Sequence, residues 1–307
     1  VAAENGEAGV KVLWPKVDRD GVIRLGDGHA WPAMRVKHAG RLVITAEPGT
    51  RPVIEPGEDR SLTLSADEIL LRGVTLRRSG TTAVLVATTN SLILEECTFI
   101  RDQKETPRKG DETAAAAAAA AVALVAAADR DLSVSLRQVI CHDNGAFLGI
   151  GGGASVRVAA VDCLAVGGGS WLTWVPPGSS LGRLSVQLEH VTLRRAGSLL
   201  EIPPRAGRGN VTIETTACVL ALRAGQWLCR GAGQAGVSVA LLGEHTLVNP
   251  ATRMGDGAME VEGLVTAAAR FRGPASSRRG DSVLSRLPEG VPHSGRALPG
   301  VRAVGEE

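Results

Sequence analysis

The stretch SVRVAAVDCLA, residues 155–165, places apolar residues at its second, fourth, seventh and ninth positions. Closely similar stretches begin at residues 68, 91, 133, 185 and 210. Apolar residues that alternate with polar ones, many of them β-branched, favour strands over helices. Successive starts are separated by 23, 42, 22, 30 and 25 residues. Steps in the low twenties are typical of a solenoid in which each coil is one supersecondary unit.

A second repeated phrase precedes most copies of the first. It is a short apolar strand followed by a bend rich in Gly, Pro, Asn or Thr, and it occurs at 82–90, 146–154, 170–178, 198–206 and 226–234. Each coil therefore contains at least two strands, and stacking the coils pairs every strand with its neighbours. These features predict an all-β fold, a right-handed parallel β-helix (solenoid) of about 8–10 coils of 22–30 residues.

The repeat defines the expected domain boundaries. We predict one β-helix domain over residues 1–272, with an irregular N-terminal cap. A charged and poly-Ala insertion at 102–121 accounts for the step of 42 residues. Residues 273–307 lose the pattern and form a Pro/Gly/Arg-rich tail, which is expected to lie on the surface or to be loose.

Side chains at the same position of successive coils are expected to stack in inward columns. The ninth position reads Leu76, Phe99, Cys141, Cys163, Leu193 and Cys218, and the fourth reads Leu71, Leu94, Leu136, Val158, Leu188 and Ile213. The cysteines resemble a redox or metal cluster, but a free cysteine is also a small buried hydrophobe. Because the five cysteines are odd in number and contain no CxxC pair, we predict packing and no metal site or disulfide framework.

Composition excludes several classes of partner. The formal net charge of +2 gives no strong field for nucleic acid, and no apolar run is long enough for membrane insertion. No signal sequence is visible and the chain begins with Val1. With free cysteines, this favours a cytoplasmic protein or a fragment of a larger one.

The repeat also carries a resemblance. The phrase with its turns resembles the right-handed parallel β-helix of the pectate-lyase-like superfamily over roughly residues 20–270. RLVITAEPGTRPVIEP (41–56) followed by LTLSADEILLRGVTLRR (62–78) is similar to β-helix regions of large planctomycete proteins, including predicted Ser/Thr kinases. No kinase signature lies in these residues. Superfamily enzymes act on acidic polysaccharides, and the hydrolase motifs (an Asp-Asp pair, Gly-His-Gly, Arg-x-Lys) have no matching positions here.

One set of residues offers candidate chemistry. His142, Asp143, Asp162 and Arg101 are expected within two neighbouring coils, where an arginine base and two carboxylates holding a cation would suit a polysaccharide lyase or glycoside hydrolase. Calcium is expected only in that case, and otherwise no cofactor is expected. The alternative is a solvated face with ordinary surface ion pairs.

Aromatic residues offer a candidate binding surface. Phe147, Trp171 and Trp227 share one position of the second phrase, and Trp174 shares another with Ile150 and Ile202. If the leucines beside the first set point inward, its rings point outward as a stripe for stacking sugars or docking a protein. The alternatives are that the insertion or the tail covers this face, or that a bend turns the rings inward.

The leading functional hypothesis is therefore a non-catalytic recognition or scaffolding domain that binds carbohydrate or protein and belongs to a larger protein. A rigid spacer is a further possibility. GAGQAG (231–236) satisfies the GxGxxG pattern, but a strand pattern follows it, so we predict a solenoid turn and no dinucleotide site.

Overall fold

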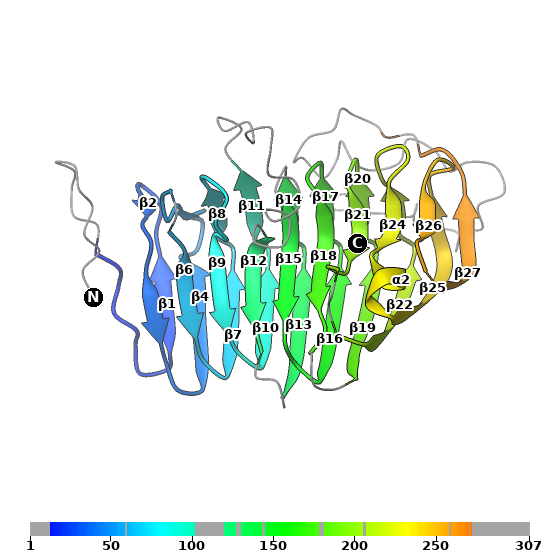
Figure 1. Ribbon diagram of the computed structural model, residues 1–307. Coiled ribbons are helices and arrows are strands. Elements are labelled where there is room, and N and C mark those ends of the chain that lie inside the picture. Colours follow the sequence, from blue (N-terminus) through cyan, green and yellow to red (C-terminus); the bar gives the residue numbers. More distant parts are fainter. Residues whose placement is uncertain are drawn as a thin grey trace.

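The computed structural model describes residues 13–58, 60–101, 120–126, 130–142, 145–177, 181–204, 207–257, 259–269 and 271. Successive strands coil around one long core, and each strand pairs in parallel with the equivalent strand of the next coil. The coils advance from β1 at one end to β27 at the other (Figure 1).

The strands form three parallel stacks. The first stack consists of β1 (Val22–Leu25), β4 (Arg41–Ala46), β7 (Glu68–Arg72), β10 (Ser91–Glu95), β13 (Asp131–Arg137), β16 (Ser155–Val161), β19 (Gly182–Glu189), β22 (Gly209–Thr216), β25 (Val237–Val248) and β27 (Met259–Thr266). The second stack consists of β2 (Ala30–Trp31), β5 (Val53–Ile54), β8 (Thr75–Arg78), β11 (Thr98–Arg101), β14 (Ile140–His142), β17 (Leu164–Val166), β20 (Thr192–Arg194), β23 (Val219–Ala221) and the end of β25.

The third stack is a separate sheet. It consists of β3 (Arg35–Lys37), β6 (Leu62–Ser65), β9 (Leu85–Thr88), β12 (Ala120–Val125), β15 (Ala146–Gly151), β18 (Ser170–Val175), β21 (Ser198–Glu201), β24 (Trp227–Arg230) and β26 (Arg253–Gly255). Among the described residues, the one helix is the single turn α2 (Ala232–Ala235). The predicted all-β parallel β-helix is thus confirmed.

The predicted columns are right in direction and partly wrong in register. Ser133 pairs with Arg157, two residues beyond the predicted partner Ser155, and Ser185 pairs with Thr212 where residue 210 was expected. Side chains of a strand alternate between its two faces, so a slip of two residues keeps every apolar residue on the inward side. Leu71, Leu94 and Leu136 pair in the predicted register and are buried, and Val158, Leu188 and Ile213 stay buried despite the slips.

A ladder of small buried side chains runs along the corner between the first and second stacks. We call it the corner ladder, and it consists of Val74, Cys97, Val139, Cys163, Val191, Cys218 and Thr246. Each member follows a residue with positive φ, namely Gly73, Glu96, Gln138, Asp162, His190, Ala217 and His245. The left-handed residue turns the chain through the corner, and the next side chain enters the core.

The corner ladder corrects one predicted column. Cys163 and Cys218 belong to it, whereas Cys141 pairs with Phe99 and Ala165 two positions further along the chain. The prediction that Cys141, Cys163 and Cys218 share a column is therefore wrong. All five cysteines are free and buried, which confirms their role in packing. Burial raises the pKa of the Cys97, Cys218 and Cys229 thiols to about 12.

The predicted insertion at 102–121 ends earlier than expected. Ala120 and Ala121, placed in the insertion by the sequence, are buried residues of β12. Residues 102–119 and the predicted tail at 273–307 lie outside the described residues.

Trp14 lies before β1 and is 8% exposed. Its ring centroid lies 5.6 Å from that of Trp31, and its indole N–H donates to the Pro32 carbonyl. Trp14 thus closes the N-terminal end of the core.

Candidate functional site

The structure brings together only part of the predicted catalytic set. His142 pairs with Ile100, so it lies beside Arg101 in the second stack. Asp162 lies at the corner between the first and second stacks, in line with Gln138 of the preceding coil. His142 pairs with Val166, which is four residues after Asp162. Asp143 lies outside the described residues. Arg101 and His142 are therefore neighbours, and Asp162 is separated from them by the length of a short strand.

The predicted outward stripe of aromatic rings is wrong for Phe147 and Trp171. Both side chains are 3% exposed. The Phe147 ring lies 5.2 Å from Phe99 and 6.3 Å from Trp171, measured between centroids. Because the third stack begins just after a bend, its first residues are directed toward the second stack. The alternative that a bend turns these rings inward is the correct one.

The other two tryptophans do not extend a stripe. Trp174 is fully buried and pairs with Ile150. Trp227 is half-buried and is one position out of line with Trp171, because Leu200 pairs with Cys229. The guanidinium carbon of Arg253 lies 5.2 Å from the Trp227 ring centroid. These side chains therefore serve packing, with Trp227 covered in part by Arg253.

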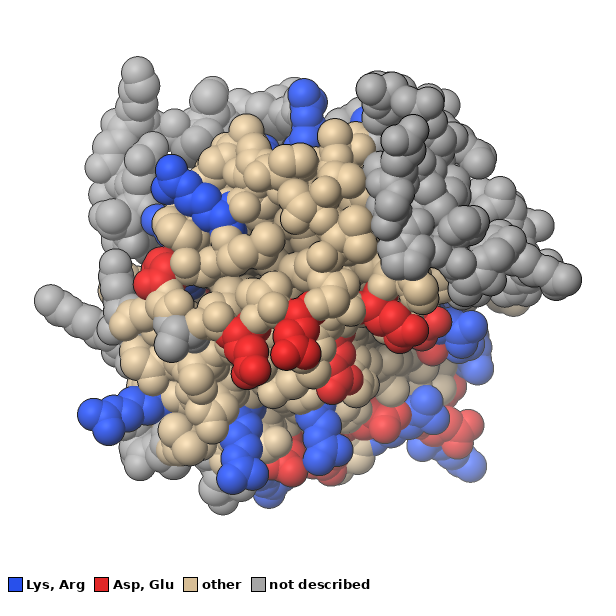
Figure 2. Space-filling view, turned by 90° about the vertical axis from the view of Figure 1, so that its right-hand side faces the viewer, with Lys and Arg blue, Asp and Glu red and all other residues tan. Residues whose placement is uncertain are grey.

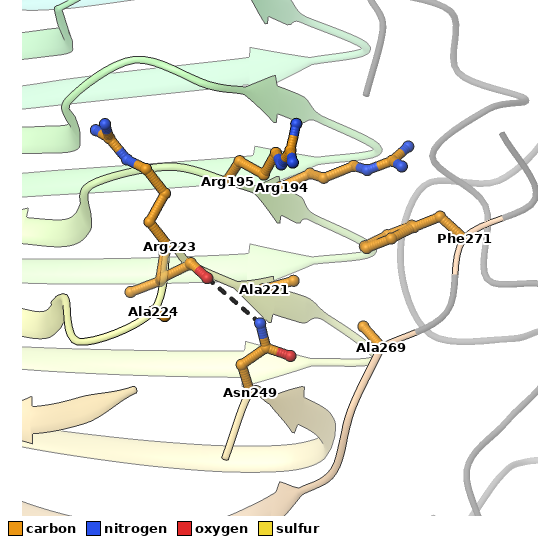
Figure 3. A pocket seen from close by; sticks show the side chains of 9 residues that line it. Arg194, Arg195, Ala221, Arg223, Ala224, Asn249, Ala269 and Phe271 are labelled. Atoms are coloured by element: carbon orange, nitrogen blue, oxygen red, sulfur yellow. Dashed lines mark hydrogen bonds between the residues drawn. The ribbon is translucent and has the colours of Figure 1, made fainter. Parts of the chain in front are cut away.

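The described residues outline a cavity of about 780 Å³ at the end of the second stack. We call it the arginine pocket, and it is lined by Arg194, Arg195, Ala221, Leu222, Arg223, Ala224, Asn249, Ala269 and Phe271. Figure 3 shows Arg194 and Arg195 at the end of β20 and Arg223 after β23, while Ala269 and Phe271 lie on the opposite side. The pocket thus lies where short strands end and where the chain after β27 passes them.

The position of each polar side chain of the pocket follows from a local contact or from the backbone conformation. Arg194 ends β20, is 9% exposed, and has its guanidinium carbon 4.2 Å from the Phe271 ring centroid. Arg195 has a φ of 58°, which turns its exposed side chain away from that of Arg194. Arg223 donates to the Gly168 carbonyl. Asn249 donates from Nδ2 to the Leu222 carbonyl at 3.3 Å, which leaves its Oδ1 as an acceptor (Figure 3).

The charge of the pocket has one sign. Among the described residues that line it, the ionisable ones are the three arginines. Guanidinium groups stay protonated at neutral pH and match carboxylate and sulfate oxygens in a two-pronged geometry. The arrangement therefore suits an anion.

Sequence reasoning missed this site because its two walls are far apart in the chain. The arginines come from residues 194–223, and the pocket also needs Phe271. A usable signal exists: arginines follow the short strands in LRRA (193–196) and ALRAG (221–225). That signal marks the arginines but does not identify the wall opposite them.

A second, smaller concavity of about 280 Å³ lies on the first stack, over β16, β19 and β22. Its ionisable side chains among the described residues are Glu189 and Glu214. Glu214 accepts from Gln187 Nε2 at 3.1 Å, and Glu189 Oε1 lies 3.8 Å from His190 Nε2. This surface is acidic and thus has the opposite sign to the arginine pocket.

The GAGQAG segment forms the turn α2 and then enters β25. The Asp256 carboxylate accepts from the backbone N–H of Gly231 at 2.8 Å and of Gly233 at 3.5 Å. Those are the donors that a dinucleotide pyrophosphate would need. The structure therefore supports a turn of the solenoid here.

Within the described ranges, no group of three or more His, Cys, Asp or Glu side chains is placed to hold a metal ion. The described part of the chain also holds no helix long and apolar enough to cross a membrane. The chain matches no known protein family, no curated protein and no solved structure.

Proposed function

We propose that the protein is a non-catalytic recognition domain that binds an acidic carbohydrate in the arginine pocket. The observation that carries this proposal is that three arginines, Arg194, Arg195 and Arg223, line one cavity of about 780 Å³. A cavity of this size is in the range that holds a small organic ligand or part of a sugar chain.

The pocket offers two kinds of polar group. The guanidinium groups of Arg195 and Arg223, both on exposed residues, are donors for carboxylate or sulfate oxygens. Asn249 Oδ1 is a neutral acceptor, which suits a hydroxyl group. A uronic or sulfated sugar carries both an acid group and hydroxyls on one small frame.

Binding without catalysis follows from the same residues. General acid–base chemistry needs a group that gains and loses a proton near the working pH. The ionisable residues known to line this pocket are arginines, which keep their proton at neutral pH. The lining therefore favours recognition over the lyase or hydrolase alternative.

The test measures binding of oligogalacturonate and of heparin oligosaccharide by calorimetry, with neutral dextran as the control ligand. Each charged hydrogen bond contributes about 1.5–3 kcal/mol, so Arg195→Ala and Arg223→Ala should each weaken binding at least about tenfold. Arg223→Lys keeps the charge but not the forked geometry, and it should fall between the wild type and Arg223→Ala.

The matched control variants are Arg137→Ala and Arg157→Ala, which remove the same charge from exposed positions of β13 and β16. They should bind within about twofold of the wild type, since distant surface charges are screened by salt. Equal losses of affinity in the pocket variants and the control variants would show that binding depends on net charge and not on the pocket. Cleavage of either oligosaccharide at a catalytic rate would contradict a non-catalytic role.

A further inference from the structure

The two ends of the solenoid are finished differently. At the N-terminal end, Trp14 covers the core beside Trp31. At the other end, β27 pairs with β25 and with no other strand among those described. A strand with one unpaired edge presents a row of backbone N–H and C=O groups to another chain.

The inward side of β27 is only partly covered. Val239 and Leu241 of β25 are at most 3% exposed, whereas their partners Met259 and Val261 in β27 are half-buried. Leu264 is half-buried as well. The last layer of the core therefore retains apolar surface that one more strand would bury.

The outward side of β27 carries Glu260 and Glu262, both exposed. Their partners in β25 are Ala240 and Leu242, which offer no positive charge, and Leu242 is itself 40% exposed. Figure 2 looks onto this end of the molecule and shows acidic side chains in a row across it. Glu260 and Glu262 thus make the outward side of β27 acidic.

Three other outward acids of the first stack face a donor directly across the strand pair. Glu68 is paired with Arg41 at 2.7 Å, Glu95 with Arg72, and Glu214 with Gln187 at 3.1 Å. Opposite-charge pairs at such positions stabilise neighbouring strands. By the same rule, the strand that completes β27 would carry basic residues opposite Glu260 and Glu262.

We propose that the edge of β27 with which no described strand pairs is a docking site for an extended basic segment of another protein, which adds to the first stack as a parallel strand. Apolar residues of that segment cover Met259 and Val261, and its Arg or Lys residues face Glu260 and Glu262. The segment therefore alternates apolar and basic residues. A second copy of this chain fits less well, since Trp14 occupies the end that it would present.

The probe is a fluorescein-labelled peptide, Thr-Val-Arg-Val-Arg-Val-Thr, and its partner peptide has Glu in place of both Arg residues. Fluorescence anisotropy with the full chain should show at least tenfold tighter binding of the Arg peptide. The variant Glu260→Arg/Glu262→Arg should reverse this preference and bind the Glu peptide. That reversal also shows that the variant is folded.

The matched control is Glu47→Arg/Glu58→Arg, which changes the net charge equally at exposed positions away from β27. It should keep the preference of the wild type. Hydrogen exchange separates strand addition from loose electrostatic attraction, because a paired edge protects backbone amides within Met259–Thr266.

Three results would overturn the proposal: equal affinity for both peptides, a preference unaffected by the Glu260/Glu262 reversal, or binding without amide protection in β27. Self-association of the wild type in sedimentation, abolished by the same reversal, would also overturn it by assigning the edge to a second copy.

Discussion

The Thr246 hydroxyl accepts a hydrogen bond from the backbone N–H of Cys218 at 3.3 Å and takes over the contacts that Cys218 makes one coil earlier. Cys218 Sγ lies 3.4 Å from the Leu188 carbonyl and 3.3 Å from that of Thr216. Thr246 Oγ1 lies 3.2 Å from the carbonyls of Thr215 and Glu244. In each case the side chain donates to its own strand and to the strand of the preceding coil.

The first prediction concerns Thr246→Val. Valine has nearly the same shape, so the change removes the hydrogen bonds and leaves the buried N–H of Cys218 without this acceptor. The free energy of unfolding should fall by about 1–3 kcal/mol, measured by urea denaturation. Thr212→Val, at an exposed position of β22, should change it by less than about 0.5 kcal/mol. Equal effects would show that the corner hydrogen bonds contribute nothing.

A second prediction follows from the buried thiols. Burial raises the pKa of Cys97 from 9.0 to about 12. The folded protein therefore holds this proton between pH 9 and pH 12 while the unfolded chain loses it. Stability from this group is present below pH 9 and is lost as the pH rises toward 12.

The slope is at most about 1.4 kcal/mol per pH unit for each such thiol. Cys97→Val should flatten the dependence of unfolding free energy on pH above 9, since valine already occupies the neighbouring ladder positions 74 and 139. Denaturation at pH 8 and pH 10 measures the slope. An unchanged slope in the variant would show that Cys97 is not the group that titrates.

A third prediction concerns the support of Trp174. A Cβ at Gly209 would lie 2.6 Å from the Trp174 ring and 2.9 Å from the Gly182 carbonyl oxygen. Gly209→Ala should therefore lower the unfolding free energy by about 1–3 kcal/mol through overpacking. Trp174→Phe should recover part of the loss when combined with it, because the smaller ring leaves room. Thermal unfolding of the single and double variants tests this, and strictly additive losses would rule out the contact.

The fourth prediction uses the left-handed corner at Ala217, whose φ is 51°. Glycine adopts this conformation without the steric cost that alanine bears, and Gly73 already occupies the equivalent corner. Ala217→Gly should raise the free energy of unfolding by up to about 1 kcal/mol. Ala159→Gly, inside strand β16, should lower it by about 0.5–1 kcal/mol. A loss at both positions would contradict the role of the corner.

The fold was predictable because its signal repeats. Alternation of apolar residues defines the inward face. The true partner of Ser133 is Arg157, two residues beyond the predicted one, and a shift of two residues leaves that face unchanged. The exact column was not predictable, because coils differ by a few residues at their corners. Cys163 shows this: its thiol contacts the carbonyls of Leu136 and Val161 at the corner and not the column of Cys141.

The candidate site was less predictable for a physical reason. Alternation within a strand is local, whereas the arginine pocket depends on Phe271 meeting Arg194 across more than one element of the chain. The predicted aromatic stripe was wrong because a local bend overrides the alternation. Periodicity assigned Phe147 to the outward face, and the bend before β15 directs it to Phe99 instead.

The corner between β11 and β12 has a practical consequence. Residues 102–119 enter there, yet β11 keeps its pairs with β8 and β14, and β12 keeps its pairs with β9 and β15. The number of residues between β11 and β12 thus does not affect the hydrogen-bonded pairing of the strands on either side. An engineer could exchange these residues for a foreign epitope or enzyme tag, and coils spaced about 4.8 Å apart would hold the graft at a fixed height along a rigid rod.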